Sequence, residues 1–295
     1  MGRDGQDRVR HSRLSAAADS APLVAVAHGS RDPRAAAAIS QLLAQARRRA
    51  AERDLAGLDI KAAFLDHCAP SLPQVLGALD SADSAADCVV VPLLLTAAYH
   101  SKTDIPARLA EARAALPRLA ARYAGTLGPH LLLLTALERR LAEAGLGLTA
   151  GDRKQTSVVL AAAGSSDPRA NATVAALAAG WQARGGWRRV VPAYASAGGP
   201  SPGEAVRALR ASAADGPVVV ASYLLAPGYF ADKIRDPALE AGADVVSAAL
   251  GAAPEVADVI LDRYQEARRI AEITRVPVGA ELSVPIVARA QLSRT

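Results

Sequence analysis

The sequence predicts an α/β protein of two similar domains, each a parallel β-sheet flanked by helices, with a cleft between the domains. Two observations carry this prediction. Short apolar runs typical of buried parallel strands alternate with alanine- and arginine-rich stretches of helical length. The same order of segments then begins again in the second half, where 157–177 shares the pattern G-S-x-D-P-R-A with 22–42. A duplicated strand-and-helix unit accounts for both observations.

The first unit begins with an apolar run at 23–30 that ends in Gly-Ser, as a buried strand does. Asp32 supplies a helix N-cap and Pro33 a first-turn proline for a helix over 34–53. The helix over 131–144 is expected to complete this unit. The other expected elements are strands at 58–65, 87–95 and about 123–127, and helices at 71–79 and from Asp104 to about Tyr123 with a bend at Pro117.

Two further segments of the second half echo the first half in the same order. Residues 193–209 echo 64–79, and 218–234 echo 89–105 with one inserted residue. Repeats of this kind usually form two domains that face each other across a cleft. The expected divisions are a disordered N-terminal tail at 1–21, a catalytic domain at 22–145, a linker at 146–155, a degenerate repeat at 156–270 and a C-terminal tail at 271–295.

The composition narrows the class of protein. A chain of 295 residues with 51% hydrophobic residues is long enough for two domains with large cores. The net charge of +5 is scattered and aromatic residues make up only 3%, so nucleic-acid binding is not indicated. No apolar run has the length of a membrane span, and the start lacks a secretory signal. Two cysteines, Cys68 and Cys88, cannot form a disulfide framework, which suits the cytoplasm.

Two histidines stand out when the halves are compared. Both halves keep the glycine, the serine and the Asp-Pro helix start, but not the reactive side chains. His28 is matched by Ala163, Arg31 by Ser166 and His100 by Phe230. The histidines are therefore not needed to fold the unit, and a function explains them better. Each also follows a predicted parallel strand, at the edge where open α/β sheets bind ligands.

Three motifs in the first half resemble a known family. AHGSRDP, FLDHCAPSL and VVVPLLLTAAYHSKTDIP, in this order and spacing, resemble the class II chelatases, and more narrowly the sirohydrochlorin chelatases of the CbiX/SirB type. The resemblance is strong over 22–145 and weak over 156–270. It implies two chelatase-like (flavodoxin-like) domains that insert Fe²⁺ or Co²⁺ into a reduced tetrapyrrole with many carboxylates, in siroheme or cobalamin synthesis. The metal is then a substrate, no prosthetic group is expected, and one chain of two halves is expected to act as a monomer.

The resemblance assigns the metal-binding and proton-accepting roles to His28 and His100. Neutral imidazole is a good ligand for iron and cobalt, and its pKa near neutrality lets it accept a proton from the macrocycle.

An acidic residue follows the second strand in this family, usually as glutamate. Asp66 stands there and is the third candidate metal ligand, while a second acidic position is occupied here by Ala69. The neighbours His67 and Cys68 are weaker candidates, because adjacent residues of a strand point to opposite faces of the sheet. Cys68 is expected to be a small buried residue.

The substrate's carboxylates need positive partners. The candidates are Arg31, Arg34 and Lys102, which lie next to the two histidines, and the backbone N–H groups of Gly29 and Ser30 ahead of the helix.

Two other functions stay open at this point. A carrier of metal or tetrapyrrole without catalysis is compatible with the same fold. A histidine-dependent hydrolase is disfavoured, because phosphohistidine enzymes have an arginine before the histidine, where Ala27 stands. Neither A-G-S-S-D nor H-G-S-R matches G-x-S-x-G, the pattern of a nucleophile elbow.

Overall fold

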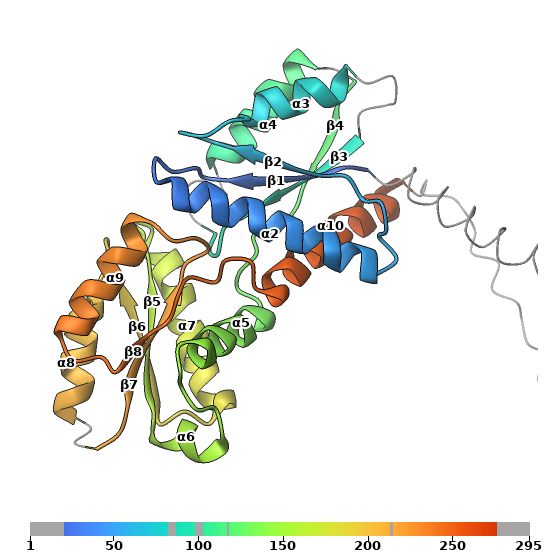
Figure 1. Cartoon of the computed structure of the whole chain (residues 1–295). Coiled ribbons are helices and arrows are strands. Elements are labelled where there is room, and N and C mark those ends of the chain that lie inside the picture. Colours follow the sequence, from blue (N-terminus) through green and yellow to red (C-terminus); the bar gives the residue numbers. More distant parts are fainter. Residues whose placement is uncertain (1–20, 82–86, 98–102, 117, 213–214, 276–295) are drawn as a thin grey trace, which may run out of the picture.

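The computed structural model describes residues 21–81, 87–97, 103–116, 118–212 and 215–275. It contains two four-stranded parallel sheets flanked by helices, so the predicted fold class is confirmed (Figure 1). The strand orders are β2-β1-β3-β4 and β6-β5-β7-β8, the same order in each half. The strands are β1 (Leu23–Ala27), β2 (Ile60–Phe64), β3 (Asp87–Pro92), β4 (Ala120–Tyr123), β5 (Ser157–Ala162), β6 (Arg189–Tyr194), β7 (Val218–Tyr223) and β8 (Val245–Val246).

The two halves also share their helix starts. Asp32 accepts a hydrogen bond from the backbone N–H of Arg34 at 2.9 Å, and Asp167 accepts one from Arg169 at 2.9 Å. Each aspartate therefore caps the helix that follows the first strand, as predicted. The helices are α2 (Pro33–Glu52), α3 (Leu72–Asp80), α4 (Ile105–Ala115), α5 (Leu131–Glu143), α6 (Ala150–Gln155), α7 (Pro168–Gly185), α8 (Pro202–Ser212), α9 (Tyr229–Glu240) and α10 (Pro254–Arg275).

The last helix of each half packs on the other half. Helix α10 contacts α2, β3 and β4, and Asp258 on α10 accepts a hydrogen bond from Arg49 on α2 at 2.9 Å. Helix α5 contacts β7 and α10, and Glu138 on α5 accepts a hydrogen bond from Trp181 on α7 at 3.0 Å. We expected the helix over 131–144 to complete the first unit, and the structure instead places it against the second sheet (Figure 1).

This exchange gives the two halves a common core. One apolar cluster contains residues of both sheets together with α2, α5, α7 and α10, which lie between the sheets. The outer faces carry separate clusters, one under α3 and α4 and the other under α8 and α9. The halves therefore fold as one body, and their relative position is set by buried apolar contacts. Within the described part of the chain, no helix has the length and apolar character needed to cross a membrane.

The region before β4 differs from the prediction. We expected a helix reaching about Tyr123 and a strand at 123–127, but α4 ends at Ala115 and β4 spans Ala120–Tyr123. Leu116, the C-cap, leaves helical geometry with φ −126° and ψ 76°. The next residue in the sequence is Pro117, whose ring disfavours helical backbone at the residue before it. The helix therefore ends before Pro117, and the expected bend at this proline lies outside the described residues.

Candidate functional site

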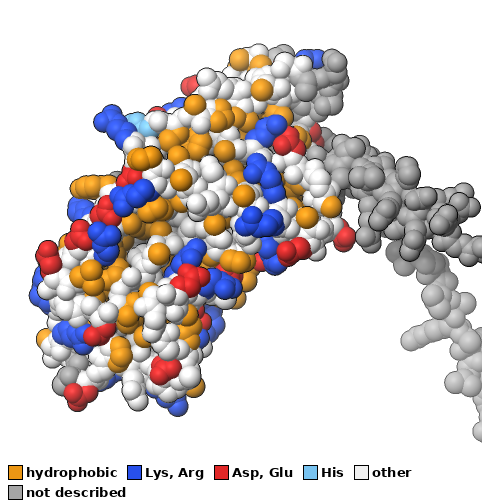
Figure 2. Space-filling model, viewed as in Figure 1, with side chains coloured by type: hydrophobic (Ala, Val, Ile, Leu, Met, Phe, Trp, Pro, Cys, Tyr) orange, Lys and Arg blue, Asp and Glu red, His pale blue; other side chains and the backbone are white. Residues whose placement is uncertain are grey.

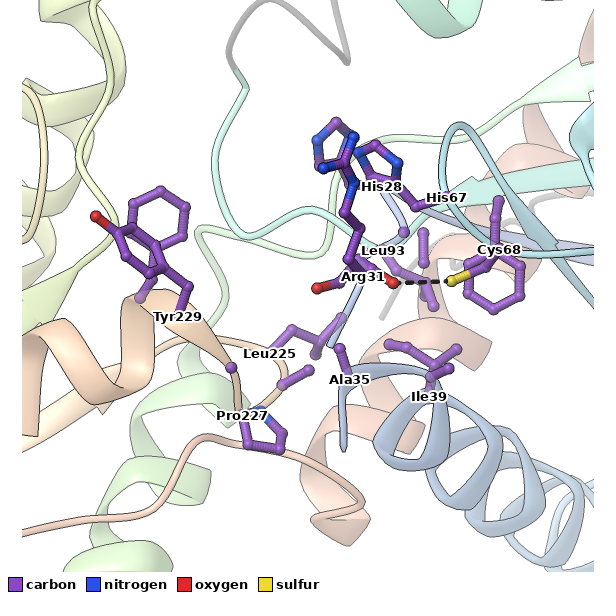
Figure 3. Close-up of a pocket in the computed structure, with 18 of the residues that line it drawn as sticks. His28, Arg31, Ala35, Ile39, His67, Cys68, Leu93, Leu225, Pro227 and Tyr229 are labelled. Carbon is purple, nitrogen blue, oxygen red and sulfur yellow. Dashed lines mark hydrogen bonds between the residues drawn. The ribbon is translucent and has the colours of Figure 1, made fainter. Parts of the chain in front are cut away.

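A cavity of about 380 Å³ lies between the two halves, at the carboxyl ends of the strands. The first half contributes the loops after β1 and β2, and the second half contributes the loop between β7 and α9 (Figure 3). A neighbouring cavity of about 280 Å³ shares His28 and reaches Gly164 and Asn171. Residues that line the larger cavity include His28, Gly29, Ser30, Arg31, His67, Cys68, Leu225, Pro227, Tyr229 and Phe230. The sequence predicted a cleft between the two halves at the carboxyl ends of the strands, and the structure has a cavity there.

The turn after β1 is held against the loop after β2. The carbonyl of His28 accepts a hydrogen bond from the backbone N–H of Asp66 at 2.9 Å. Gly29 has φ +92°, and a Cβ at this position would lie 1.8 Å from the carbonyl oxygen of Asp66. Only glycine combines this backbone geometry with so close an approach. The exposed imidazole of His28 is therefore presented from a tightly constrained turn.

Asp66 and His67 lie in different surroundings. The Asp66 side chain is 45% exposed, is 3.7 Å from the Arg108 guanidinium, and is not among the residues lining either cavity. His67 lines the larger cavity and has φ +61°, in the left-handed region. In Figure 3 the imidazoles of His28 and His67 lie at the same end of the pocket.

The argument from strand alternation does not apply to His67. Strand β2 ends at Phe64, so the period of two no longer applies three residues later. Two signals in the sequence pointed to His67: it follows the end of a parallel strand, and Ala197 replaces it in the repeat.

The thiol of Cys68 is occupied by a local contact. It donates a hydrogen bond to the carbonyl of Ser30 at 3.3 Å, so the loops after β1 and β2 touch here as well. Burial raises the pKa of the other thiol, Cys88, to about 12, which keeps it protonated at neutral pH. Ser30 also accepts, through its hydroxyl oxygen, a hydrogen bond from the backbone N–H of Asp32 at 3.0 Å. These residues shape the turn that carries His28.

The predicted cations have different environments. Arg31 lines the larger cavity and is exposed. The Arg34 guanidinium lies 2.7 Å from a carboxylate oxygen of Asp32 and 2.7 Å from one of Asp232, on α9 of the other half. The hydrogen bond from Arg34 holds the pKa of Asp232 below its ordinary value. His100 and Lys102 lie outside the described residues.

In the second half, an amide side chain joins the two loops at the corresponding position. Asn171 donates to the carbonyl of Ser165 at 2.8 Å and to that of Ala197 at 3.1 Å, and its own oxygen accepts from the N–H of Ser165 at 3.0 Å. Ala163 stands where the first half has His28. Among the described residues, no group of three or more histidine, cysteine, aspartate or glutamate side chains is arranged to hold a metal ion.

Comparisons with known proteins agree with this architecture. The chain is 34% identical over 116 residues to a sirohydrochlorin cobaltochelatase of Priestia megaterium, a match covering 39% of this chain and only 37% of that relative. It is 26% identical to a sirohydrochlorin ferrochelatase of the same organism, over 63% of this chain and 68% of the relative. The solved structure of SirB from Bacillus subtilis with Fe³⁺ superposes with a TM-score of 0.69 at 24% identity, covering 86% of this chain and 97% of SirB.

The same comparisons test the duplication. The family model of CbiX matches twice, over residues 22–144 and again over 157–267. The two matches follow the two sheets, so the second half is a diverged copy of the first. Together they cover well over half of the sequence, and the chain belongs to the CbiX family.

Proposed function

We propose that this protein is a sirohydrochlorin chelatase that inserts a divalent metal ion, Fe²⁺ or Co²⁺, into its tetrapyrrole substrate. The observation that carries the proposal is the cavity between the halves, with exposed histidines on one wall and apolar side chains on the other. Its relatives include both a cobaltochelatase and a ferrochelatase that act on sirohydrochlorin, which supports the substrate and leaves both metals as candidates.

Metal insertion requires groups that hold the ion and groups that accept protons. Insertion moves a hydrated M²⁺ ion into the ring and releases two pyrrole N–H protons. We assign His28 and His100 to holding the ion and accepting these protons, since neutral imidazole performs both tasks near pH 7. His67, which lines the same cavity as His28, is added as a third imidazole at the metal side. Asp66 is retained as an alternative ligand that must first leave Arg108.

Substrate carboxylates are assigned to the positive and N–H-bearing groups of the first half. Arg31 on the cavity wall, Lys102, and the backbone of Gly29 and Ser30 are the proposed partners. For Arg34, a substrate carboxylate would compete with Asp32 and Asp232, which its guanidinium already contacts. The metal is a substrate in this scheme, and the two halves of one chain form the whole cleft, so a monomer is sufficient.

The test is metal insertion followed by the absorbance of the tetrapyrrole. Purified protein, sirohydrochlorin and either Fe²⁺ or Co²⁺ are expected to convert substrate faster than the non-enzymatic reaction, with many turnovers per chain. Substrate binding without turnover would identify a carrier and refute the chelatase assignment. Competition between the two ions in one reaction then gives the metal preference.

A further inference from the structure

Two aromatic side chains on the second half are unusually exposed. The chain has only ten aromatic residues, six of them tyrosine. Tyr229 is 68% exposed and Phe230 is 40% exposed, and among the described residues these are the only large aromatic side chains so exposed. They are adjacent in the first turn of α9, with ring centroids 5.3 Å apart in an edge-to-face arrangement. Neighbouring exposed apolar groups of this size commonly mark a binding surface.

Both rings line the cavity that contains His28. Figure 3 shows Tyr229 on the opposite side of the pocket from the labelled histidines, with Leu225 and Pro227 lower in the view. The ammonium of the exposed residue Lys233, one helical turn later, lies 5.8 Å from the centroid of the Tyr229 ring. The cavity therefore has imidazoles and Arg31 on one wall, aromatic rings on the other and an apolar floor.

The surrounding surface has matching character. Figure 2 shows, on the face viewed, hydrophobic side chains between the two halves, bordered by basic and acidic ones. A flat conjugated ring with carboxylates at its periphery suits such a space, because aromatic faces stack on the ring while cations at the rim meet the acids. A metal ion alone gains nothing from the aromatic wall.

We propose that Tyr229 and Phe230 form a binding wall for the macrocycle, which packs against them while the metal ion is delivered from the histidine side. This inference rests on the proposed function and assigns the second half a part in substrate binding. Phe230 stands at the position that corresponds to His100 in the first half. The diverged copy has thus replaced a metal-binding side chain with one that contacts the ring.

The test is a titration of the full-length protein, without metal, with sirohydrochlorin, followed by the absorbance of the tetrapyrrole. Tyr229→Ala and Phe230→Ala are each expected to raise the Kd roughly two- to tenfold, and the double variant roughly tenfold or more, as expected for lost aromatic contacts. Tyr229→Phe should stay within about twofold of the unchanged protein, because the ring is kept. Phe230→Leu should bind more weakly than the unchanged protein although the side chain remains apolar.

Leu239→Ala is the matched control. Leu239 lies on the same helix and is 48% exposed, but it does not line the cavity. Its substitution should leave sirohydrochlorin binding and metal insertion unchanged. Co²⁺ titration of the Tyr229→Ala/Phe230→Ala protein provides a second readout, in which unchanged Co²⁺ affinity is expected.

The outcomes separate this inference from the proposed function. If the unchanged protein binds and metallates sirohydrochlorin, and the double variant binds it equally well, the aromatic wall is refuted while the chelatase function stands. An equal loss with Leu239→Ala, or a matching loss of Co²⁺ affinity, also refutes the wall. If the unchanged protein neither binds nor metallates sirohydrochlorin, both proposals fail.

Discussion

The turn after the first strand has a similar backbone in both halves, but the side chains around it differ. In the first half Ala36 lines the open cavity beside His28. In the second half Asn171 occupies the position of Ala36, and its amide bonds to the carbonyls of Ser165 and Ala197. The conserved glycine and the capping aspartate keep the turn in each copy. The two copies therefore share the residues that fold the unit and differ in side chains that line the cavities.

The largest effect is expected from removing a histidine of the first half. His28→Ala should lower the rate of metal insertion by roughly 10²- to 10⁴-fold, the usual contribution of a positioned acid–base group. The exposed side chain makes little contribution to packing, so the melting temperature should hardly change. The insertion assay with a thermal melt measures both, and His100→Ala is expected to behave alike.

The corresponding substitution in the second half tests whether a histidine there would bind a metal ion. Ala163→His places an imidazole at the corresponding position of the second half, where Asn171 hydrogen-bonds to both loops. Co²⁺ titration should give one site per chain in the unchanged protein and in this variant, and that site should be lost in His28→Ala. A second site that survives His28→Ala would contradict the division of roles between the halves.

The next effect concerns the glycines of the two turns. Gly29→Ala should lower the free energy of unfolding by about 3 kcal/mol, since a Cβ would lie 1.8 Å from the Asp66 carbonyl oxygen at a left-handed φ. Gly164→Ala should cost less, because the corresponding approach to Ala197 is 2.6 Å. Urea unfolding monitored by circular dichroism gives both values.

Gly145→Ala is the control for backbone strain alone. Gly145 has φ +96°, but nothing lies within 4 Å of an added Cβ. Its cost should be about 1 kcal/mol, the penalty for a left-handed alanine. If all three variants were equally destabilised, the close approach at Gly29 would have no special role.

A smaller effect distinguishes His67 from Asp66. His67→Ala should weaken Co²⁺ binding about tenfold, because an imidazole on the cavity wall is lost. Asp66→Asn should change Co²⁺ affinity less, since that carboxylate lies beside Arg108 outside the cavity. Calorimetric titration measures both. The reverse order would make Asp66 the ligand and His67 a residue of the loop, as the family resemblance suggested.

The smallest effect is expected from the ion pair that joins the halves beside the cavity. Arg34 lowers the pKa of both Asp32 and Asp232 below the ordinary value of 3.8. A carboxylate with a depressed pKa contributes stability above its unfolded pKa and loses it as the pH falls through its folded pKa. The melting temperature of Arg34→Gln should therefore lie slightly below that of the unchanged protein at pH 7. The difference should shrink as the pH falls below about 4 and disappear once the pH is below the folded pKa values of the two aspartates.

High ionic strength provides the control for this pair. The side chains are solvent-exposed, so added salt at pH 7 should reduce the difference between the two proteins. A difference that is independent of both pH and salt would show that Arg34 acts through packing rather than through its charge.

The prediction from sequence succeeded where the signal was local and repeated. The alternation of apolar strands and helices, with Asp32 and Asp167 before prolines, identified both sheets and the helix starts. The position of His28 at a strand end followed from the same pattern. It could not place the His67 side chain, because the side-chain period of a strand does not extend past Phe64, where the strand ends.

The sequence by itself therefore determined the duplicated α/β units, their caps and the half that carries the histidines. Only the tertiary structure decided that α5 and α10 exchange partners, that Arg34 meets Asp232 and that Asp66 lies beside Arg108. Periodicity shows that a helix has an apolar face, but not which sheet that face will cover. That choice depends on chain segments far apart in sequence, because residues of both halves are buried in one apolar core. This packing places Tyr229 and Phe230 across the cavity from His28.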